Sequence, residues 1–240
     1  MIATDQPTIF GSGVIAAVSS KNDGNIKFGL DDDTETLANR QAFLEKAGID
    51  IHHTSLVGIT YDTEDFAKYR IATSHDKTIG MLAPNMQNHV DALVVTQPNH
   101  ALFLPIADCA GAILYDPKKR ILMVSHLGRH SAEQHGAQRS VEYLQEECGS
   151  LPADLKVWLS PAVGKATYPL HQFHGRSLHE VLKEQLLHAG IAEKNLAISP
   201  IDTATDPNYY SYSEYLKGNR AEPSRFAVVA MMTVQGEPAV

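Results

Sequence analysis

The chain has 240 residues but little cysteine, with Cys109 and Cys148 as its two thiols. Two cysteines do not build a disulfide framework, so we expect a reducing environment such as the cytoplasm. The N-terminus has neither the basic start nor the apolar stretch of a secretory signal. The longest apolar run near the C-terminus, Phe226–Thr233, is far short of the roughly 20 residues that a membrane span needs. We therefore expect a soluble, cytoplasmic protein with no membrane partner.

Long basic runs and familiar catalytic motifs are also lacking. The formal net charge is −8, and no basic run is longer than Lys118-Lys119-Arg120. Because phosphate neutralisation supplies most of the affinity for nucleic acids, we expect no nucleic-acid partner, although a small phosphorylated ligand needs only one or two cations. No G-x-G-x-x-G, Walker, H-E-x-x-H, C-x-x-C or G-x-S-x-G pattern occurs. The ordinary nucleotide-binding, zinc-protease and serine-hydrolase interpretations are therefore excluded.

What the chain does contain is an irregular alternation of helix-like and strand-like segments, with no repeat and no long linker. The apolar spacing predicts three helices, at 34–48, 132–148 and 177–188. Strand-like runs lie at 101–109, 121–126, 155–160, 196–201 and 225–234. This order lacks the strict βαβ rhythm of a doubly wound sheet. We therefore predict one α+β domain over residues 1–240, with mixed sheets sandwiched between helices.

Two of the strand-like runs end in side chains that carry chemistry. The first ends in the thiol of Cys109 and the second in the imidazole of His126, with a turn-like segment at 116–120 between them. Such strands could place both side chains at the same edge of a sheet. The pair suits a thiolate–imidazole metal site, or a thiol nucleophile with its base. A buried structural thiol with an unrelated surface imidazole is the alternative, since free cysteine is among the most buried residue types.

Other conspicuous residues have simpler explanations. Cys148 shares the apolar face of the predicted helix 132–148, which favours a core position. Asp108 faces away from Cys109 if both lie in a strand, so we expect it to orient the backbone. Of Tyr209, Tyr210 and Tyr212, we expect two in the core.

Several short motifs occur in an order that resembles one known family. Ala107-Asp108-Cys109 resembles its ADC motif, and His126-Leu-Gly its HAGW motif. Further matching segments are Asn39-Arg40, 91–96, 160–164 with Tyr168, and 206–212. Together they resemble the laccase-domain or YfiH-like family, first described as polyphenol oxidases and later as purine nucleoside phosphorylases. The resemblance implies α/β/β/α layers shared with some Cys–His deamidases, and cleavage of adenosine or inosine by phosphate at a zinc site.

The resemblance assigns roles to particular residues and leaves one position unfilled. Family zinc ligands are a histidine of a Q-x-H-G motif and the Cys and His of the two motifs above, which here are Cys109 and His126. The stretch 54–61, where the first histidine is expected, contains none. The candidates to replace it are Asp202, His52, His53 and His130. The family's HAGWRG motif is altered to HLGRHS, which leaves Arg40, Arg129 and His130 as candidates to bind substrate or phosphate.

Three interpretations follow from these residues. The first is a divergent purine nucleoside phosphorylase with Cys109 and His126 as its catalytic pair, zinc as its candidate cofactor, and nucleoside and phosphate as its small-molecule partners. The second is a metal-free amidase or deamidase, with Cys109 as nucleophile and His126 as base. The third is a non-catalytic relative, so the sequence alone does not establish that the chain is an enzyme. Several coppers would need more His and Cys ligands than these motifs supply. Either a monomer or a homodimer agrees with the sequence.

Overall fold

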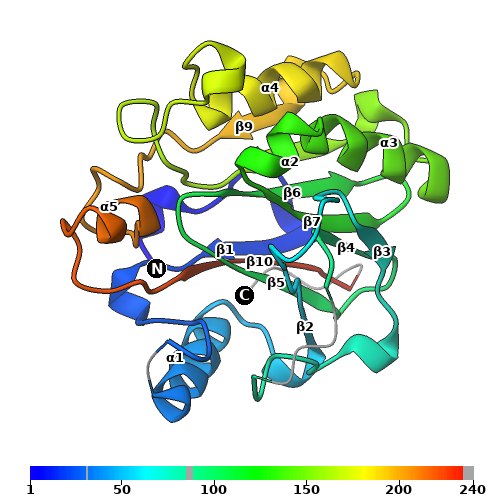
Figure 1. Cartoon of the computed structure of the whole chain (residues 1–240). Helices are drawn as coiled ribbons and strands as arrows, with labels where there is room; N and C mark the ends of the chain where they lie inside the picture. Colours follow the sequence, from blue (N-terminus) through cyan, green and yellow to red (C-terminus); the bar gives the residue numbers. More distant parts are fainter. Residues whose placement is uncertain (31, 85–88, 235–240) are drawn as a thin grey trace.

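Two β-sheets lie face to face at the centre of the molecule, with helices on both outer faces (Figure 1). The computed structural model describes residues 1–30, 32–84 and 89–234. The first sheet has the order β1-β10-β5-β2, with bounds β1 Val14–Val18, β10 Phe226–Met232, β5 Ala101–Ile106 and β2 Thr54–Leu56. The second sheet has the order β3-β4-β7-β6-β8-β9, with bounds β3 Tyr69–Ile71, β4 Ala92–Val95, β7 Ile121–Leu127, β6 Ala110–Asp116, β8 Lys156–Leu159 and β9 Leu196–Ile198.

Helices cover the outer faces of the two sheets. Helix α1, Asp33–Lys46, begins where the Asp32 side chain accepts a hydrogen bond from the Thr34 N–H, and it covers the first sheet. Two longer helices cover the second sheet, α3 at Gly136–Cys148 and α4 at Leu178–His188. Two short helices complete the set, α2 at Arg129–Glu133 and α5 at Tyr212–Leu216. Among the described residues, none of the helices is both long and apolar enough to cross a membrane.

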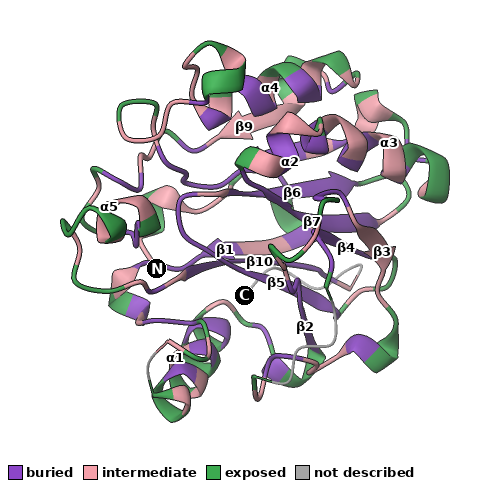
Figure 2. Cartoon of the chain, viewed as in Figure 1, coloured by how far each residue is buried: buried purple, intermediate pink, exposed green. Residues whose placement is uncertain are grey.

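Side-chain alternation along the strands divides the core into three layers. In β5, Leu102 and Leu104 lie between the sheets, whereas Phe103 packs toward α1. In β7, Val124 lies between the sheets and Met123 faces the layer of α3 and α4. Figure 2 shows the result, with buried strands at the centre and exposed residues on the outer helices. The predicted α+β fold with sheets between helices is confirmed.

The predicted helix 132–148 is wrong as a single helix, because it is divided into α2 and α3. His135 adopts a left-handed backbone with φ of +59°, which ends α2 and reverses the chain direction. At Gly136 an added Cβ would lie 1.9 Å from the Ser131 hydroxyl, so α2 and the start of α3 pack too closely for a side chain there. Cys148 is partly buried against the layer between the second sheet and its helices, as predicted.

The predicted strand 101–109 is also too long, since β5 ends at Ile106. Asp108 has a φ of +73° and turns the chain between β5 in one sheet and β6 in the other. Cys109 therefore stands directly before β6 and not at the end of β5. This turn matters because it carries the thiol across from one sheet to the edge of the other.

Candidate active site

The antiparallel pairing of β6 with β7 brings the Cys109 thiol beside the His126 imidazole. Gly111 pairs with His126 and Ala110 with Leu127, so Cys109 comes opposite Gly128. A Cβ added at Gly128 would lie 2.8 Å from Cys109 Sγ and 3.3 Å from His126 Cε1. Glycine is therefore the residue that lets the chain pass this close to both side chains.

The turn before Cys109 is fixed by hydrogen bonds to Asp108. Its Oδ1 accepts from the Thr203 hydroxyl at 2.9 Å, and its Oδ2 accepts from the Ser213 N–H at 2.6 Å. The Val163 N–H donates to the Asp108 carbonyl at 2.9 Å. These bonds hold Asp108 in its left-handed backbone conformation. Asp108 therefore orients the backbone of Cys109, as we predict from the sequence.

The electrostatics of the pair favour a thiolate beside an imidazolium. Burial opposes ionisation of the Cys109 thiol, but the adjacent charge of His126 outweighs it and holds the pKa of Cys109 below its ordinary value. Burial likewise opposes protonation of His126, yet the Cys109 thiolate and the Asp91 carboxylate raise its pKa to about 9. These opposite shifts favour an ion pair between the partly buried Cys109 thiolate and the buried His126 imidazolium, and the thiolate is the reactive form of a thiol.

The His126 ring has no hydrogen-bond partner among the described residues, although it is 2% exposed. Its Nδ1 lies 3.8 Å from Asp91 Oδ1, too far for a hydrogen bond but close enough to feel the charge. The other carboxylate oxygen of Asp91 accepts from the Lys68 N–H at 3.0 Å. Because buried ring nitrogens are rarely left unpaired, this imidazole is poised to bond with a ligand.

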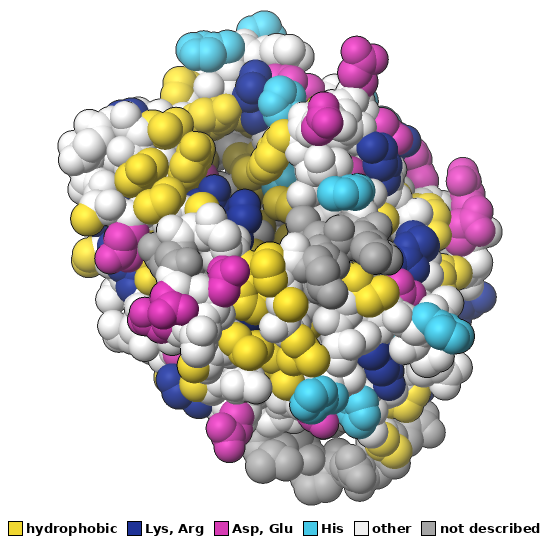
Figure 3. All heavy atoms as spheres, turned by 60° about the horizontal axis from the view of Figure 1, so that its bottom comes forward, with side chains coloured by type: hydrophobic (Ala, Val, Ile, Leu, Met, Phe, Trp, Pro, Cys, Tyr) yellow, Lys and Arg dark blue, Asp and Glu magenta, His cyan; other side chains and the backbone are white. Residues whose placement is uncertain are grey.

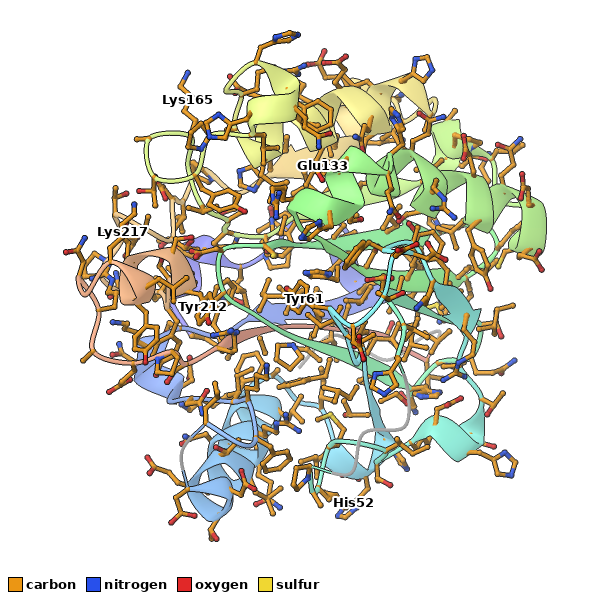
Figure 4. All side chains as sticks on the ribbon, viewed as in Figure 1. His52, Tyr61, Glu133, Lys165, Tyr212 and Lys217 are labelled. Atoms are coloured by element: carbon orange, nitrogen blue, oxygen red, sulfur yellow. The ribbon has the colours of Figure 1, made fainter. Side chains whose placement is uncertain are left out.

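Tyr61 supplies the third side chain at this centre, from the stretch that lacks the family's histidine. Its hydroxyl lies 4.0 Å from Cys109 Sγ, and its ring meets the His126 ring edge-on, with centroids 6.3 Å apart. Tyr61 is 61% exposed, and the adjacent Cys109 thiolate raises the pKa of its phenol well above the usual range. Tyr61 therefore remains a neutral phenol. The residue is labelled near the middle of Figure 4.

These residues do not provide the ligand set of a catalytic zinc ion, which needs three protein donors. Among the described residues, no three His, Cys, Asp or Glu side chains gather closely enough to hold a metal. The cavity offers two donors at this centre, the Cys109 thiol and the His126 imidazole, and a metal would have to displace the proton of each. The third neighbour is the neutral Tyr61 phenol. We therefore derive no chemical step through a metal.

Of the four candidate replacements for the missing ligand, only His130 lines the same cavity. Asp202 instead accepts hydrogen bonds from the N–H groups of Gly164 and Ala204. His52 and His53 belong to the turn Ile51–His53, and Figure 4 shows His52 at the end of the molecule away from Tyr61.

A cavity of about 590 Å³ surrounds the Cys109–His126 pair. Figure 3 shows a hollow in this surface bordered by hydrophobic side chains, with Lys and Arg side chains inside it. The volume suits a ligand of nucleoside size together with a small anion. Aromatic residues line it beside the pair, namely Phe28, Tyr61, Phe66, Tyr168 and Tyr212. Tyr209 and Tyr210 are buried in the core, which confirms that two of the three C-terminal tyrosines have a structural role.

Arg40 lines the cavity wall, but its guanidinium donates its hydrogen bonds to backbone carbonyls. It is 1% exposed; its Nε donates to the Ile26 carbonyl at 2.7 Å, and its Nη1 donates to the carbonyls of Gly80 and Met81 at 2.7 and 3.1 Å. The guanidinium also lies over the Phe28 ring, 4.1 Å from its centroid. Its role as a phosphate ligand remains a prediction, whereas its role in joining three segments is visible.

Arg129 and His130 line the cavity from the start of α2. Arg129 Nη2 lies 3.1 Å from His130 Nε2, and Arg129 Nη1 lies 3.7 Å from a Glu133 carboxylate oxygen. The His130 ring stacks on Phe66 with centroids 4.6 Å apart. Both side chains reach the cavity, and their part in substrate binding stays a prediction.

Two cations that the sequence pattern did not identify also line the cavity, Lys27 and Arg225. They lie far apart in the chain and outside every motif, so only the fold brings them to the site.

Comparison with known proteins identifies both family and fold. Residues 12–176 match the family model described as multi-copper polyphenol oxidoreductase laccase. The structure resembles that of the hypothetical protein YfiH of Bacillus licheniformis, at 21% identity and a TM-score of 0.82, over 92% of this chain and 93% of that one. It also resembles YlmD from Geobacillus stearothermophilus, at 18% identity and a TM-score of 0.84, over 98% of both chains.

A curated relative adds a name but covers less of the chain. Purine nucleoside phosphorylase of Bacteroides thetaiotaomicron is 22% identical over 99 residues, which are 41% of this chain. The match spans 35% of the length of that protein.

Proposed function

The chain belongs to the family described as multi-copper polyphenol oxidoreductase laccase, and we propose that it cleaves the N-glycosidic bond of purine nucleosides with phosphate as acceptor. The substrate class is supported by the name of the Bacteroides relative and by the size of the cavity. The observation that carries the proposal is the placement of the Cys109 thiol beside the buried His126 imidazole in this cavity, where each group favours the charged form of the other.

Such a pair matches the charges that develop when an N-glycosidic bond breaks. The C1′–N9 bond electrons pass to the purine, and the sugar acquires oxocarbenium character. The His126 imidazolium donates a proton to the leaving purine as general acid. The Cys109 thiolate stabilises the positive sugar, and a phosphate oxygen then forms the new bond to C1′. Solvent afterwards returns the proton to His126.

A phosphate-dependent assay tests this proposal. Purified protein is incubated with inosine or adenosine, with and without phosphate, and the free base and ribose 1-phosphate are measured. We expect release of both products only with phosphate, and a loss of about 100-fold or more in the His126→Gln variant, because a general acid contributes on that scale. His188→Gln on the exposed end of α4 is the matched control and should keep full activity. Absence of base release from every purine nucleoside would refute the proposal.

A thiol amidase is the second candidate, favoured by the adjacency of Cys109 as nucleophile and His126 as base, with the Asp91 carboxylate 3.8 Å from His126 Nδ1. The thiolate would attack an amide carbonyl, ammonia would leave with a proton from His126, and water would hydrolyse the thioester. This candidate predicts ammonia release from glutamine amides that stops when Cys109 is alkylated. The Cys148→Ala variant controls for modification of the other thiol. An unreactive Cys109 with no turnover in either assay would favour a non-catalytic family member.

A further inference from the structure

Arg225 stands next to the catalytic pair because of the sheet register. Strand β10 begins one residue later, at Phe226, which pairs with Ile106 at the end of β5. The chain continues from Ile106 through the Asp108 turn to Cys109, so Arg225 lies alongside this turn. Its guanidinium lies over the Tyr212 ring, 4.8 Å from the centroid, and it lines the cavity.

Lys27 is held beside Arg225 by the side chain of Asn25. The Oδ1 atom of Asn25 accepts from the N–H groups of both Lys27, at 3.2 Å, and Arg225, at 3.0 Å. In addition, the Ile26 N–H donates to the Arg225 carbonyl at 3.3 Å. Two positive residues from opposite ends of the chain are therefore fixed side by side through backbone contacts that do not involve their charges.

The segment that carries Lys27 is itself anchored to α1. Asn39 Nδ2 donates to the Asn25 carbonyl at 3.0 Å, and Arg40 Nε donates to the next carbonyl, that of Ile26. The Asn-Arg pair of the sequence motif thus acts as a positioning pair for this segment. Asn39 and Arg40 therefore influence the cavity by holding the segment that carries Lys27 in place.

Neither cation has an ion-pair partner in the part of the chain that the structure describes. Within residues 1–30, 32–84 and 89–234, no carboxylate lies within 4.0 Å of Lys27 Nζ or the Arg225 guanidinium. Arg225 Nη1 donates to the carbonyls of Pro223 and Ser224, while its Nε and Nη2 and the Lys27 ammonium make no hydrogen bond to a described residue. Burial lowers the pKa of Lys27, and the neighbouring Arg225 lowers it further. Lys27 is exposed and Arg225 is partly buried, and the two neighbouring positive charges repel each other, which an anion bound between them would relieve.

We propose that Lys27 and Arg225 form a phosphate-binding subsite in the wall of the Cys109–His126 cavity. The ligand is a phosphate dianion, which Arg225 contacts with its free guanidinium edge and Lys27 as a point charge. The assignment rests on the proposed function, in which phosphate is the acceptor. The same chemistry also fits the phosphate ester of a nucleotide. Arg129 and His130 line the same cavity from α2 and are not part of this proposal.

Direct binding of phosphate to the full chain tests the subsite without relying on activity. Inorganic phosphate and adenosine 5′-monophosphate are titrated separately by calorimetry at low ionic strength. Lys27→Gln is the decisive variant, because the ammonium makes no bond to the protein and its loss leaves the fold intact. We expect affinity to fall about tenfold, as for removal of one charge-assisted hydrogen bond. Lys27→Arg should restore most of it.

The control is Lys165→Gln, the same charge change at an exposed residue that points into solvent in Figure 4 and does not line the cavity. Weaker binding in Lys27→Gln but not in this control supports the subsite, whichever phosphate compound binds. If inorganic phosphate binds, it is the source; if the monophosphate alone binds, the source is a nucleotide ester. Equal affinity of wild type and Lys27→Gln, or no binding of either probe to wild type, overturns the proposal.

The outcome is distinguishable from failure of the proposed function. Phosphate binding that depends on Lys27, without nucleoside cleavage, would keep the subsite and refute phosphorolysis. Phosphorolysis with the same KM for phosphate in Lys27→Gln would keep the function and refute the subsite.

Discussion

Replacing Cys109 with alanine removes the negative charge that keeps the buried His126 ring protonated. Burial alone lowers the pKa of His126, but the thiolate and the Asp91 carboxylate outweigh burial and raise the pKa from 6.5 to about 9. That difference corresponds to roughly 3 kcal/mol in favour of the charged ring. In the variant, Asp91 remains 3.8 Å from Nδ1 without a hydrogen bond, so burial dominates. We expect the pKa of His126 to fall below 6.5 in Cys109→Ala.

Titration of the histidine ring signals by NMR measures this change directly. Wild-type His126 should titrate near pH 9 and the Cys109→Ala variant below pH 6.5, while Cys148→Ala should behave as wild type. The activity should depend on pH in the same way, because His126 acts as the general acid in the proposed reaction. The rate should fall as pH rises through about 9, where the His126 ring loses its proton. In Cys109→Ala that fall should move below pH 6.5. A His126 that still titrates near 9 without the thiolate would refute the ion pair as the cause.

Three further outcomes follow from the same centre. Elemental analysis of wild-type protein should find less than one tightly bound zinc per chain. The Tyr61→His variant adds a third donor and should raise zinc retention, whereas the control Tyr212→His should not. One zinc per wild-type chain that is lost on mutation of Cys109 would contradict this prediction. Gly128→Ala should reduce turnover at least tenfold with little change in melting temperature, because its Cβ would lie 2.8 Å from Cys109 Sγ; unchanged kinetics would show that the thiol can move aside. Arg40→Met should lower the free energy of unfolding by about 3 kcal/mol, because it leaves three buried carbonyls unpaired. Urea denaturation measures this free energy, and an unfolding curve like that of wild type would contradict a structural role for Arg40.

Local signals in the sequence predicted the elements whose boundaries depend on local chemistry. Asp32 and Ser177 cap α1 and α4, and in each case the cap adjoins the first helical turn in the chain. The break at His135 and the early end of β5 before Asp108 could not be predicted. Both depend on non-glycine residues with left-handed backbones that tertiary contacts hold in place.

The candidate site was predictable only in part, for a related reason. Cys109 and His126 end apolar runs and match motifs, so they could be identified from the chain. Lys27 and Arg225 carry no such signal, because they meet through Asn25 and the register of β10 with β5. Tyr61 could have been noticed as the last residue of the stretch that lacks a histidine, but only the structure shows its hydroxyl 4.0 Å from the thiol.

The charges around Cys109 suggest why this chain departs from the family pattern in more than one place. A buried thiolate needs a compensating positive charge, which a three-ligand zinc site supplies where one exists. Here the imidazolium of His126 supplies it directly, and Arg225 acts on the same thiolate from the side of β10. A neutral tyrosine in place of a third ligand agrees with this arrangement, because it adds no negative charge. Placing a histidine at position 61 restores a third donor, but zinc binding would still compete with the ion pair. Zinc bound to Cys109 and His126 would require His126 to lose its proton. The gain in zinc affinity of Tyr61→His should therefore grow steeply as pH rises toward 9. Zinc titrations of that variant at pH 6.5 and 8.5 measure this, and a pH-independent affinity would contradict the ion pair.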